Sequence, residues 1–343
     1  MPTAPYDAVV VVSFGGPEGP DDVIPFLENV TRGRDVPRER LEEVAEQYRS
    51  VGGVSPINSQ NRSLVESLAT ELADHDLELP VYWGNRNWAP YLTDTVRQMA
   101  DDGVRRALAF VTSAYSSYSG CRQYLEDIAR ARAEAGGDAP EIDKIRQFWN
   151  HPGFVEPFRD QLRHTLAQLG EAAPVDPATT QLVFSAHSLP LSMAATSDYV
   201  AQLEDAVGLV ADAVAPDLPR ALVWQSRSGP PQVPWLEPDV NDHLRALASE
   251  GVAQVVVVPI GFVSDHQEVV YDLDIRAAAT AEELGLRMAR LPTPLHDPRF
   301  VAMVRELIEE RLDPTVEPRA LGVRGVRPAP CAEGCCPAPG RPR

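Results

Sequence analysis

The sequence has few cysteines, few basic residues and no apolar run long enough to cross a membrane. Of its 343 residues, 31 are Lys or Arg and 50 are Asp or Glu, which gives a formal net charge of −19. A surface of that sign repels phosphate backbones, so nucleic acid is not expected as a partner. The first residues, MPTAPYDAVVVVSFGGPEG, lack a basic start, and their short apolar run indicates a buried strand rather than a signal peptide. We expect a cytoplasmic protein without a transmembrane segment.

The few cysteines raise a question of number. The chain has four: Cys121, Cys331, Cys335 and Cys336. In a reducing compartment these favour metal ligands or structural thiols over disulfides, and cysteine-built sites commonly use four thiolates. An iron–sulfur cluster, a Zn²⁺ site and a tail with free thiols are the alternatives. The end of the chain, RPAPCAEGCCPAPGRPR, has almost nothing apolar with which to fold, so a metal tie to Cys121 would order it.

Apolar runs and helical periods alternate along the rest of the chain, in the manner of α/β proteins. Strand-like runs occupy residues 8–17, 79–90, 107–120, 181–190, 221–235 and 254–268. The amphipathic segments between them predict helices, and this alternation favours parallel sheets covered on both faces. A chain of this length suggests two domains. We predict two similar Rossmann-like α/β domains that face each other across an active-site cleft.

The predicted boundaries follow from this division. The N-terminal domain is expected at 1–150, the C-terminal domain at 151–315 with its last helix packed back on the first, and a cysteine-containing tail at 316–343. The protein is expected to be a monomer. Ligands of open parallel sheets bind beyond the carboxyl ends of the strands. The loops to search are therefore 13–17, 115–121, 185–190, 225–235 and 262–268.

Two of these loops carry candidate chemistry. VFSAHSLP places His187 directly after a buried strand, where an imidazole accepts protons near neutral pH or binds a transition metal. Alone, this histidine is better explained as one that satisfies a loop carbonyl. FVSDHQEVVYDLD adds Glu268 and Asp272, four residues apart on one helical face. One imidazole with a carboxylate suits a borderline divalent ion such as Fe²⁺.

The helix that carries these acids is expected to begin near Asp265. Ser264 and Gln267 have the spacing of a capping box. That start places Glu268 one turn inside the helix, and Asp265 is best explained as a solvated acid that complements the helix dipole. Other motifs are missing from the sequence: FGGPEG and SVGGVSPIN fit no nucleotide-binding pattern, and neither G-x-S-x-G nor H-E-x-x-H occurs.

Six segments in order resemble those of ferrochelatases, which insert Fe²⁺ into a porphyrin. They are SFGGP, VTRGRDVP, YRSVGGVSPIN, FSAHSLP, VWQSRSGPPQVPWLEPDV and PIGFVSDHQEVVYDLD. The resemblance runs from about residue 6 to about residue 312. It implies a chelatase-type fold with the porphyrin held between the two domains and Fe²⁺ as substrate.

The resemblance also implies residue roles. His187 matches the metal-binding and proton-accepting histidine, Glu268 its partner carboxylate, and Asp272 a continuing acidic ridge. The residues expected to line the macrocycle or its propionates are Phe14, Arg32, Tyr48, Ser55 and Tyr124. Cys121, Cys331, Cys335 and Cys336 resemble the ligands of the [2Fe–2S] cluster that some family members carry, although the compact C-x3-C-C spacing differs from wider spacings among them.

The chain departs from the family pattern at two positions. Phe14 stands where soluble Gram-positive members often have a tyrosine that ligates the metal, so that ligand is not expected here. Arg276 stands where many relatives keep an acid, which predicts a shorter carboxylate relay.

The choice of porphyrin depends on the segment IPFLENVTRGRDVPRERLEEVAEQYRS. Members that use protoporphyrin commonly have an apolar lip there, whereas this lip is charged and amphipathic. It suits coproporphyrin III, whose four propionates keep it in water, and protoporphyrin IX is the alternative. The competing functions are a non-catalytic tetrapyrrole-binding or haem-delivery protein, a cobalt or nickel chelatase, and an iron–sulfur electron carrier, in which the pair of His187 and Glu268 would have no use.

Overall fold

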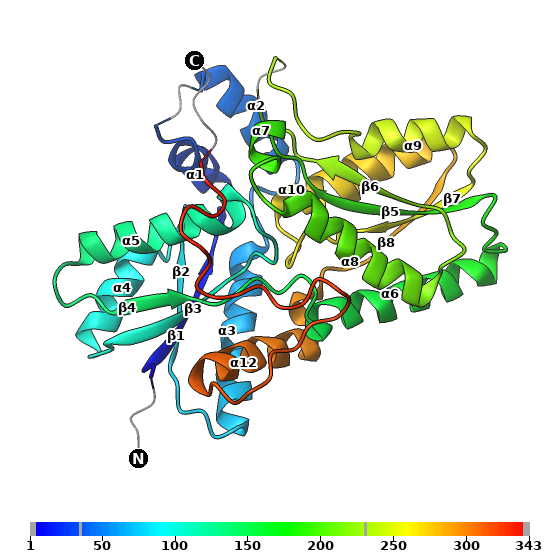
Figure 1. Ribbon diagram of the computed structural model, residues 1–343. Helices are drawn as coiled ribbons and strands as arrows, with labels where there is room; N and C mark the ends of the chain where they lie inside the picture. The colour runs from blue at the N-terminus through cyan, green and yellow to red at the C-terminus, as the bar shows by residue number, and fades with distance from the viewer. Residues whose placement is uncertain (1–4, 34–35, 230–231, 339–343) are drawn as a thin grey trace.

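The chain forms two parallel four-stranded sheets of the same strand order. The computed structural model describes residues 5–33, 36–229 and 232–338. The first sheet has the order β2–β1–β3–β4, with β1 (Ala8–Ser13), β2 (Val81–Asn85), β3 (Arg106–Val111) and β4 (Glu141–Lys144). The second has the order β6–β5–β7–β8, with β5 (Thr180–His187), β6 (Arg220–Gln225), β7 (Gln254–Val258) and β8 (Arg287–Arg290). The prediction of two similar α/β halves is confirmed (Figure 1).

Two of the eight strands were not predicted from the sequence. Each of the six apolar runs contains a strand, but β4 and β8 have the sequences EIDK and RMAR. Both form one edge of their sheet and none of their residues is fully buried. The other two edge strands, β2 and β6, end in buried residues and show an apolar run, whereas β4 and β8 stay partly exposed throughout and show none.

Helices cover both faces of each sheet. Those of the first half are η1 (Pro20–Asp22), α1 (Val23–Val30), α2 (Arg38–Arg49), α3 (Ile57–Asp74), α4 (Leu92–Asp101), the π-helix η2 (Tyr118–Arg122) and α5 (Gln123–Ala135). Those of the second half are α6 (Pro152–Ala172), α7 (Leu191–Ala194), α8 (Tyr199–Val214), α9 (Val240–Ser249), α10 (Gln267–Val269), the π-helix η3 (Val270–Ala277), α11 (Ala278–Glu283), η4 (Pro294–His296) and α12 (Pro298–Leu312). Among the described residues, no helix has the length and apolar character of a membrane span.

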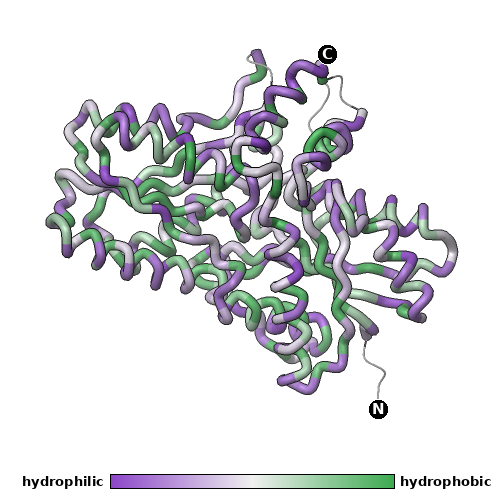
Figure 2. Tube along the Cα trace, turned by 180° about the vertical axis from the view of Figure 1, so that it is seen from behind, coloured by the Kyte–Doolittle hydropathy of each residue, from purple (hydrophilic) through white to green (hydrophobic). Residues whose placement is uncertain are grey.

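Successive side chains of a strand point to opposite faces of the sheet, and each set packs against its own group of helices. In β1, Val10 and Val12 pack with α4 and α5, whereas Val9 and Val11 belong to the core that includes α3. In the second sheet, Val183 faces α9, η3 and α11, and the opposite face packs with α6 and α8. Apolar colouring follows the strands, and the helices alternate between apolar and polar colouring (Figure 2).

The two halves share one core. The largest buried cluster joins residues of both sheets, and α12 packs against α3 of the first half and α6 of the second. Tyr115 of the first half donates to the carbonyl oxygen of Ile260 in the second (2.7 Å). We call the region in which residues of the two halves contact each other the junction.

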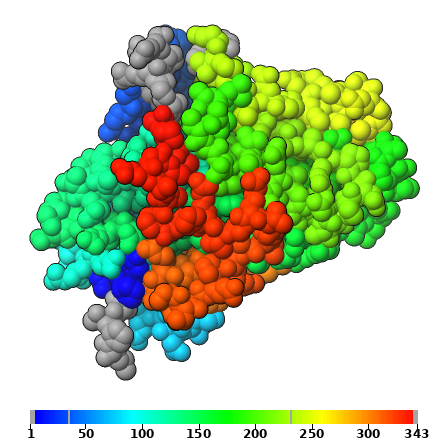
Figure 3. Space-filling view, in the orientation of Figure 1, coloured from blue at the N-terminus to red at the C-terminus, as the bar shows by residue number. Residues whose placement is uncertain are grey.

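Residues 313–338 form a tail that crosses the surface of both halves (Figure 3). The Leu321 N–H donates to the Asn150 carbonyl oxygen (2.7 Å), and the Asn150 amide donates to the Gly325 carbonyl oxygen (2.8 Å). Arg319 pairs with Glu306 of α12. The first part of the tail is therefore held by hydrogen bonds, an ion pair and the packing of Leu321 against the main core.

Candidate active site

His187 is the last residue of β5, and three contacts fix its position. Its main chain pairs with Gln225 at the end of β6, and its carbonyl oxygen accepts from the Tyr199 hydroxyl (3.0 Å). Its Nδ1 lies 2.6 Å from the Ser188 carbonyl oxygen, to which it donates. This assigns the Nδ1 proton and leaves Nε2 3.6 Å from Oε2 of Glu268. The structure thus brings together the two residues on which the sequence prediction depended.

Glu268 lies in the first turn of α10, but the predicted cap of this helix is wrong. The helix begins at Gln267 and not near Asp265. Nδ1 of His266 accepts from the Glu268 N–H (3.1 Å) and takes the place that the pattern assigned to the Ser264 hydroxyl. An imidazole nitrogen and a hydroxyl oxygen are both acceptors, so the spacing of residues alone could not distinguish them.

Asp265 is also not the solvated first-turn acid that we predicted. Its carboxylate accepts from Arg290 (2.8 Å). Its main chain exchanges two hydrogen bonds with the side-chain amide of Gln60 in α3, at 3.1 and 3.4 Å. Asp265 therefore ties the loop before Glu268 to the first half.

His187 and Glu268 form an ion pair in the resting site. Burial acts to lower the pKa of His187, but the Glu268 carboxylate and the Ser188 carbonyl raise it above its ordinary value. Desolvation acts to raise the pKa of Glu268, but the charge on His187 outweighs it and lowers the pKa to about 2. An imidazolium beside a carboxylate follows from these opposite shifts.

Asp272 lies one turn further, in the π-helix η3, with a side chain that is 8% exposed. It accepts hydrogen bonds from Oγ of Ser226 (2.5 Å) and from Nη1 of Arg276 (3.2 Å). Burial raises the pKa of Asp272, and the charge of Glu268 acts in the same direction. Arg276 therefore pairs with Asp272, and the series of acids that begins at Glu268 does not continue to position 276.

The first half contains an aromatic cluster, of which Tyr48 lies close to this pair. The rings of Phe14, Tyr48 and Trp88 pack around Phe26, with centroids 6.0 to 6.2 Å from it. Phe14 is 36% exposed. Burial raises the pKa of Tyr48 far above its ordinary value, and the Glu268 carboxylate raises it further, so α2 lies close to the ion pair. Phe14 and Tyr48 are thus placed on the first-half side of the junction.

Two other predicted substrate contacts are buried. Ser55 is 4% exposed and lies beneath Gly16, where a Cβ atom would come within 2.6 Å of the Ser55 Cβ. Tyr124 is 5% exposed, and its ring lies 3.8 Å from the guanidinium carbon of Arg86, which also lies over Phe14. Ser55 thus packs against Gly16 and Tyr124 against Arg86, and their contact with a substrate stays a prediction.

Sequence reasoning missed Gln225, Ser226 and His266. The search region 225–235 included the first two, because polar residues follow an apolar run there, but nothing in the sequence singled them out. Ser226 contacts Asp272, and Gln225 donates through Nε2 to the Glu268 carbonyl oxygen (3.3 Å). Only their contacts in the folded chain identify these residues, because Gln225 and Glu268 are 43 positions apart in the sequence.

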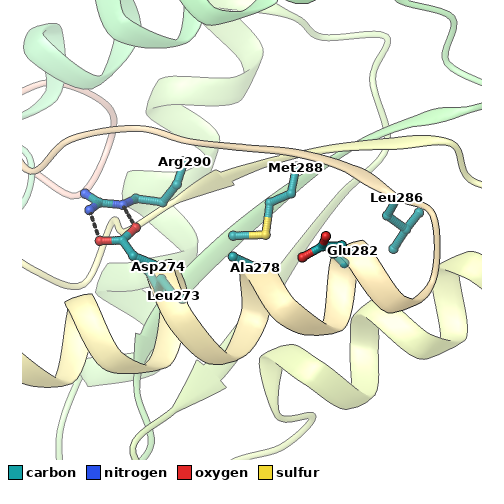
Figure 4. A pocket seen from close by; sticks show the side chains of 8 residues that line it. Leu273, Asp274, Ala278, Glu282, Leu286, Met288 and Arg290 are labelled. Atoms are coloured by element: carbon teal, nitrogen blue, oxygen red, sulfur yellow. Dashed lines mark hydrogen bonds and ion pairs between the residues drawn. The ribbon is translucent and has the colours of Figure 1, made fainter. Parts of the chain in front are cut away.

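A pocket of about 410 Å³ lies outside this site (Figure 4). Its lining comes from η3, α11 and β8 with the segments beside them, and includes Asp274, Glu282, Met288 and Arg290. Arg290 donates two hydrogen bonds to Asp274, so the charges at this end of the pocket are already paired. His187, Glu268 and Asp272 do not line it, and we assign no function to it.

Cys121 lies buried in η2, where it meets the tail. A hydrogen bond with Cys331 lowers the pKa of Cys121 to about 6, against the opposing effect of burial. Lys144, the only lysine of the chain, and Nε2 of Gln147 (2.7 Å) act in the same direction as Cys331. These contacts favour the thiolate form of Cys121, which is the form that binds metals.

The other two cysteines form a second pair beside the first. The sulfur atoms of Cys335 and Cys336 are 3.5 Å apart, and Nη2 of Arg327 lies 3.4 Å from that of Cys335. Burial and Cys335 raise the pKa of Cys336 to about 12, and Cys331 contributes. Within the described ranges, no three His, Cys, Asp or Glu side chains are grouped to hold a single metal ion. The four cysteines gather as two pairs.

The fold and the family are both found among known proteins. The structure of SirB from Bacillus subtilis with Fe³⁺ aligns with a TM-score of 0.54 and 11% identity, over 89% of this chain and 98% of that one. At this identity the likeness shows the fold alone, a two-sheet α/β fold of the kind that SirB has.

Sequence comparison identifies the family. Residues 6–312 match the ferrochelatase family model. The chain is 54% identical to the coproporphyrin III ferrochelatase of Streptomyces coelicolor, over 98% of this chain and 95% of that relative. It is 50% identical to the ferrochelatase of Rhodopirellula baltica, over 97% and 93%. The chain belongs to the ferrochelatase family.

Proposed function

We propose that this protein inserts Fe²⁺ into coproporphyrin III, with release of two protons, and so makes a haem precursor. The observation that supports the site is the ion pair of His187 and Glu268 beyond the carboxyl end of the second sheet. The observation that supports the substrate is the similarity to coproporphyrin III ferrochelatases over nearly the whole chain. The iron remains Fe²⁺ throughout, so the reaction needs no electron donor.

His187 acts in this proposal as the base that takes pyrrole N–H protons. In the resting site the Glu268 carboxylate lies 3.6 Å from Nε2 of His187 and favours the protonated imidazole. A dication that binds beside Glu268 neutralises that charge and repels the imidazolium, which then loses its proton and can accept one from the ring. Arrival of the metal therefore prepares the base.

The two carboxylates have different expected effects. Glu268→Gln keeps the shape and removes the charge that attracts Fe²⁺, so we expect KM for Fe²⁺ to rise by about 10-fold or more, with little change in porphyrin affinity. Asp272→Asn is expected to be milder, since Asp272 lies further along the helix and already pairs with Arg276. Anaerobic steady-state kinetics in Fe²⁺ measure both. A reversed ranking would mean that the carboxylates are wrongly placed around the metal.

Substrate choice depends on the lip formed by α1 and α2. Their apolar residues, among them Phe26, Leu27 and Leu41, pack against each other, and the charged residues face solvent. Between residues 23 and 51, the part of the lip that the structure describes exposes no large apolar side chain. A lip with a polar surface favours a water-soluble porphyrin as the substrate over one that is taken up from a membrane. Arg32 is exposed just after α1, and we propose that it binds propionates.

Arg32→Ala is therefore expected to raise KM for coproporphyrin III by a larger factor than it lowers kcat. Arg245→Ala, which removes an exposed arginine from α9, is the matched control and should change neither constant. The wild-type protein should metallate coproporphyrin III faster than protoporphyrin IX in buffer and in detergent. Faster insertion into protoporphyrin IX under both conditions would reverse the substrate assignment without affecting the assignment of the site.

We further propose that Cys121, Cys331, Cys335 and Cys336 hold a [2Fe–2S] cluster. Each iron of such a cluster takes two thiolates, so two pairs fit it where a single ion would need a closer group. The thiolate character of Cys121 and the cations Lys144 and Arg327 beside the sulfurs suit a negatively charged cluster. The cluster would supply a tie between the tail and the first half, with no part in metal insertion. Zn²⁺ bound by the same thiolates is the second candidate.

We also propose that the protein works as a cytoplasmic monomer. His187 and Glu268 belong to one half and Tyr48 to the other half of the same chain. The site as described draws on no second copy.

A further inference from the structure

Ser226 follows β6 directly and has a left-handed backbone conformation, with φ of +62°. Residues other than Gly, Asn and Asp rarely adopt this conformation, which costs free energy. Among the described non-glycine residues, only Asp76 and Cys336 share a positive φ. A serine persists there when contacts of its side chain hold it in place, so those contacts indicate its role.

The Ser226 hydroxyl is the closer of two donors to Asp272. Its Oγ lies 2.5 Å from Oδ2, whereas Nη1 of Arg276 lies 3.2 Å from Oδ1. The Arg276 side chain is 48% exposed and the Asp272 side chain 8% exposed. The Arg276 side chain is thus exposed, whereas the Ser226 hydroxyl makes the shorter bond to the buried carboxylate. The serine therefore fixes the orientation of this carboxylate.

Gln225, the residue before Ser226, contacts the rest of the site. Its carbonyl oxygen accepts from the Ser188 N–H (2.8 Å), and its side chain donates to the carbonyl oxygen of Glu268. The end of β6 thus touches the strand of His187 and both turns of the acidic helix. The left-handed turn at Ser226 brings its hydroxyl onto η3 directly after these contacts.

We propose that Ser226 is a positioning residue for metal insertion, which holds the Asp272 carboxylate toward Glu268 and His187. This inference rests on the proposed role of Asp272. Without the hydroxyl, Asp272 keeps Arg276 as its charged partner and turns toward solvent with it. Ser226 itself touches neither the metal nor the porphyrin in this proposal.

Three substitutions separate the hydroxyl from the backbone. Ser226→Ala removes the donor, Ser226→Gly removes the donor and also the backbone cost, and Ser226→Asn keeps a donor on a residue that tolerates positive φ. We expect kcat for Fe²⁺ insertion to fall severalfold in the Ala and Gly variants, by no more than in Asp272→Asn, and to recover largely in the Asn variant. KM for the porphyrin should stay within about twofold of the wild type in all three.

A double-mutant cycle with Asp272→Asn tests whether Ser226 acts through Asp272. If it does, Ser226→Ala should lower kcat by less than about twofold in the Asp272→Asn background. Wild-type kcat in Ser226→Gly, or the full loss on adding Ser226→Ala to Asp272→Asn, would overturn the inference while leaving the proposed role of Asp272 intact. Wild-type kcat in Asp272→Asn alone would overturn both.

Asp76→Gly is the matched control for the backbone effect. Asp76 has a φ of +57° and is exposed after α3, in the other half of the molecule. Its replacement should leave kcat unchanged. Thermal unfolding of Ser226→Gly should occur at or above the wild-type temperature, so a lower kcat in that variant reports the lost hydroxyl; unfolding well below it would count against a purely positioning role.

Discussion

His187→Ala is expected to lower kcat for Fe²⁺ insertion by roughly 10²–10⁴-fold, the contribution typical of a general base. The Ser188 carbonyl and β5 fix the imidazole in its place. Among the described side chains, His187 is the one that lies with Nε2 3.6 Å from Oε2 of Glu268. Porphyrin affinity should change little, because the His187 imidazole acts on the pyrrole nitrogens and does not bind the propionates. Anaerobic kinetics measure the rate, and a spectroscopic titration without metal measures porphyrin binding.

The comparison needs a histidine replacement that leaves the site intact. His164 is exposed on α6, and His164→Ala should retain wild-type kcat. The loss in His187→Ala also separates two functional classes, because a tetrapyrrole carrier would bind porphyrin equally well and insert no metal in either form. Near-normal turnover in His187→Ala would remove this residue from the mechanism.

The sequence predicted the fold wherever burial leaves a pattern. The six strands that contain buried residues stand out as apolar runs, and the order of helices between them required parallel sheets. The strands β4 and β8 leave no such pattern, because none of their residues is buried. The two π-helices were also missed, since their residues have the same composition as an α-helix and differ only in hydrogen-bond register.

The site was predictable to the extent that its residues lie close in sequence. Glu268 and Asp272 share one motif, and His187 stands at a strand end that topology makes a ligand site. Ser226 could not be found this way, because its contact with Asp272 spans 46 positions. The burial of Ser55 beneath Gly16 depends on how two loops pack, which no single motif describes.

The cysteines give the other large expected effect. Anaerobically purified protein should be coloured, and Cys121→Ser should lose its visible absorption entirely, because the serine hydroxyl does not ionise at neutral pH and replaces the thiolate poorly. Cys121 is the only one of the four that belongs to the body of the protein, so its loss also detaches the remaining three from the first half. Iron and inorganic sulfide should fall together with the colour.

Two measurements make the result specific to the cysteines. Arg319→Ala breaks an exposed ion pair of the same tail with Glu306 and should leave the colour unchanged, which separates loss of ligands from loosening of the tail. Metal analysis distinguishes the alternatives, since stoichiometric zinc without sulfide would assign the four thiolates to Zn²⁺. Protein without bound metal would mean that hydrogen bonds such as those of Asn150, together with the ion pairs of Arg319 and Arg327, hold the tail unaided. In Cys121→Ser those same bonds should keep residues 313–325 in place, so proteolysis of the variant should begin beyond Arg327, in the segment whose cysteines meet Cys121.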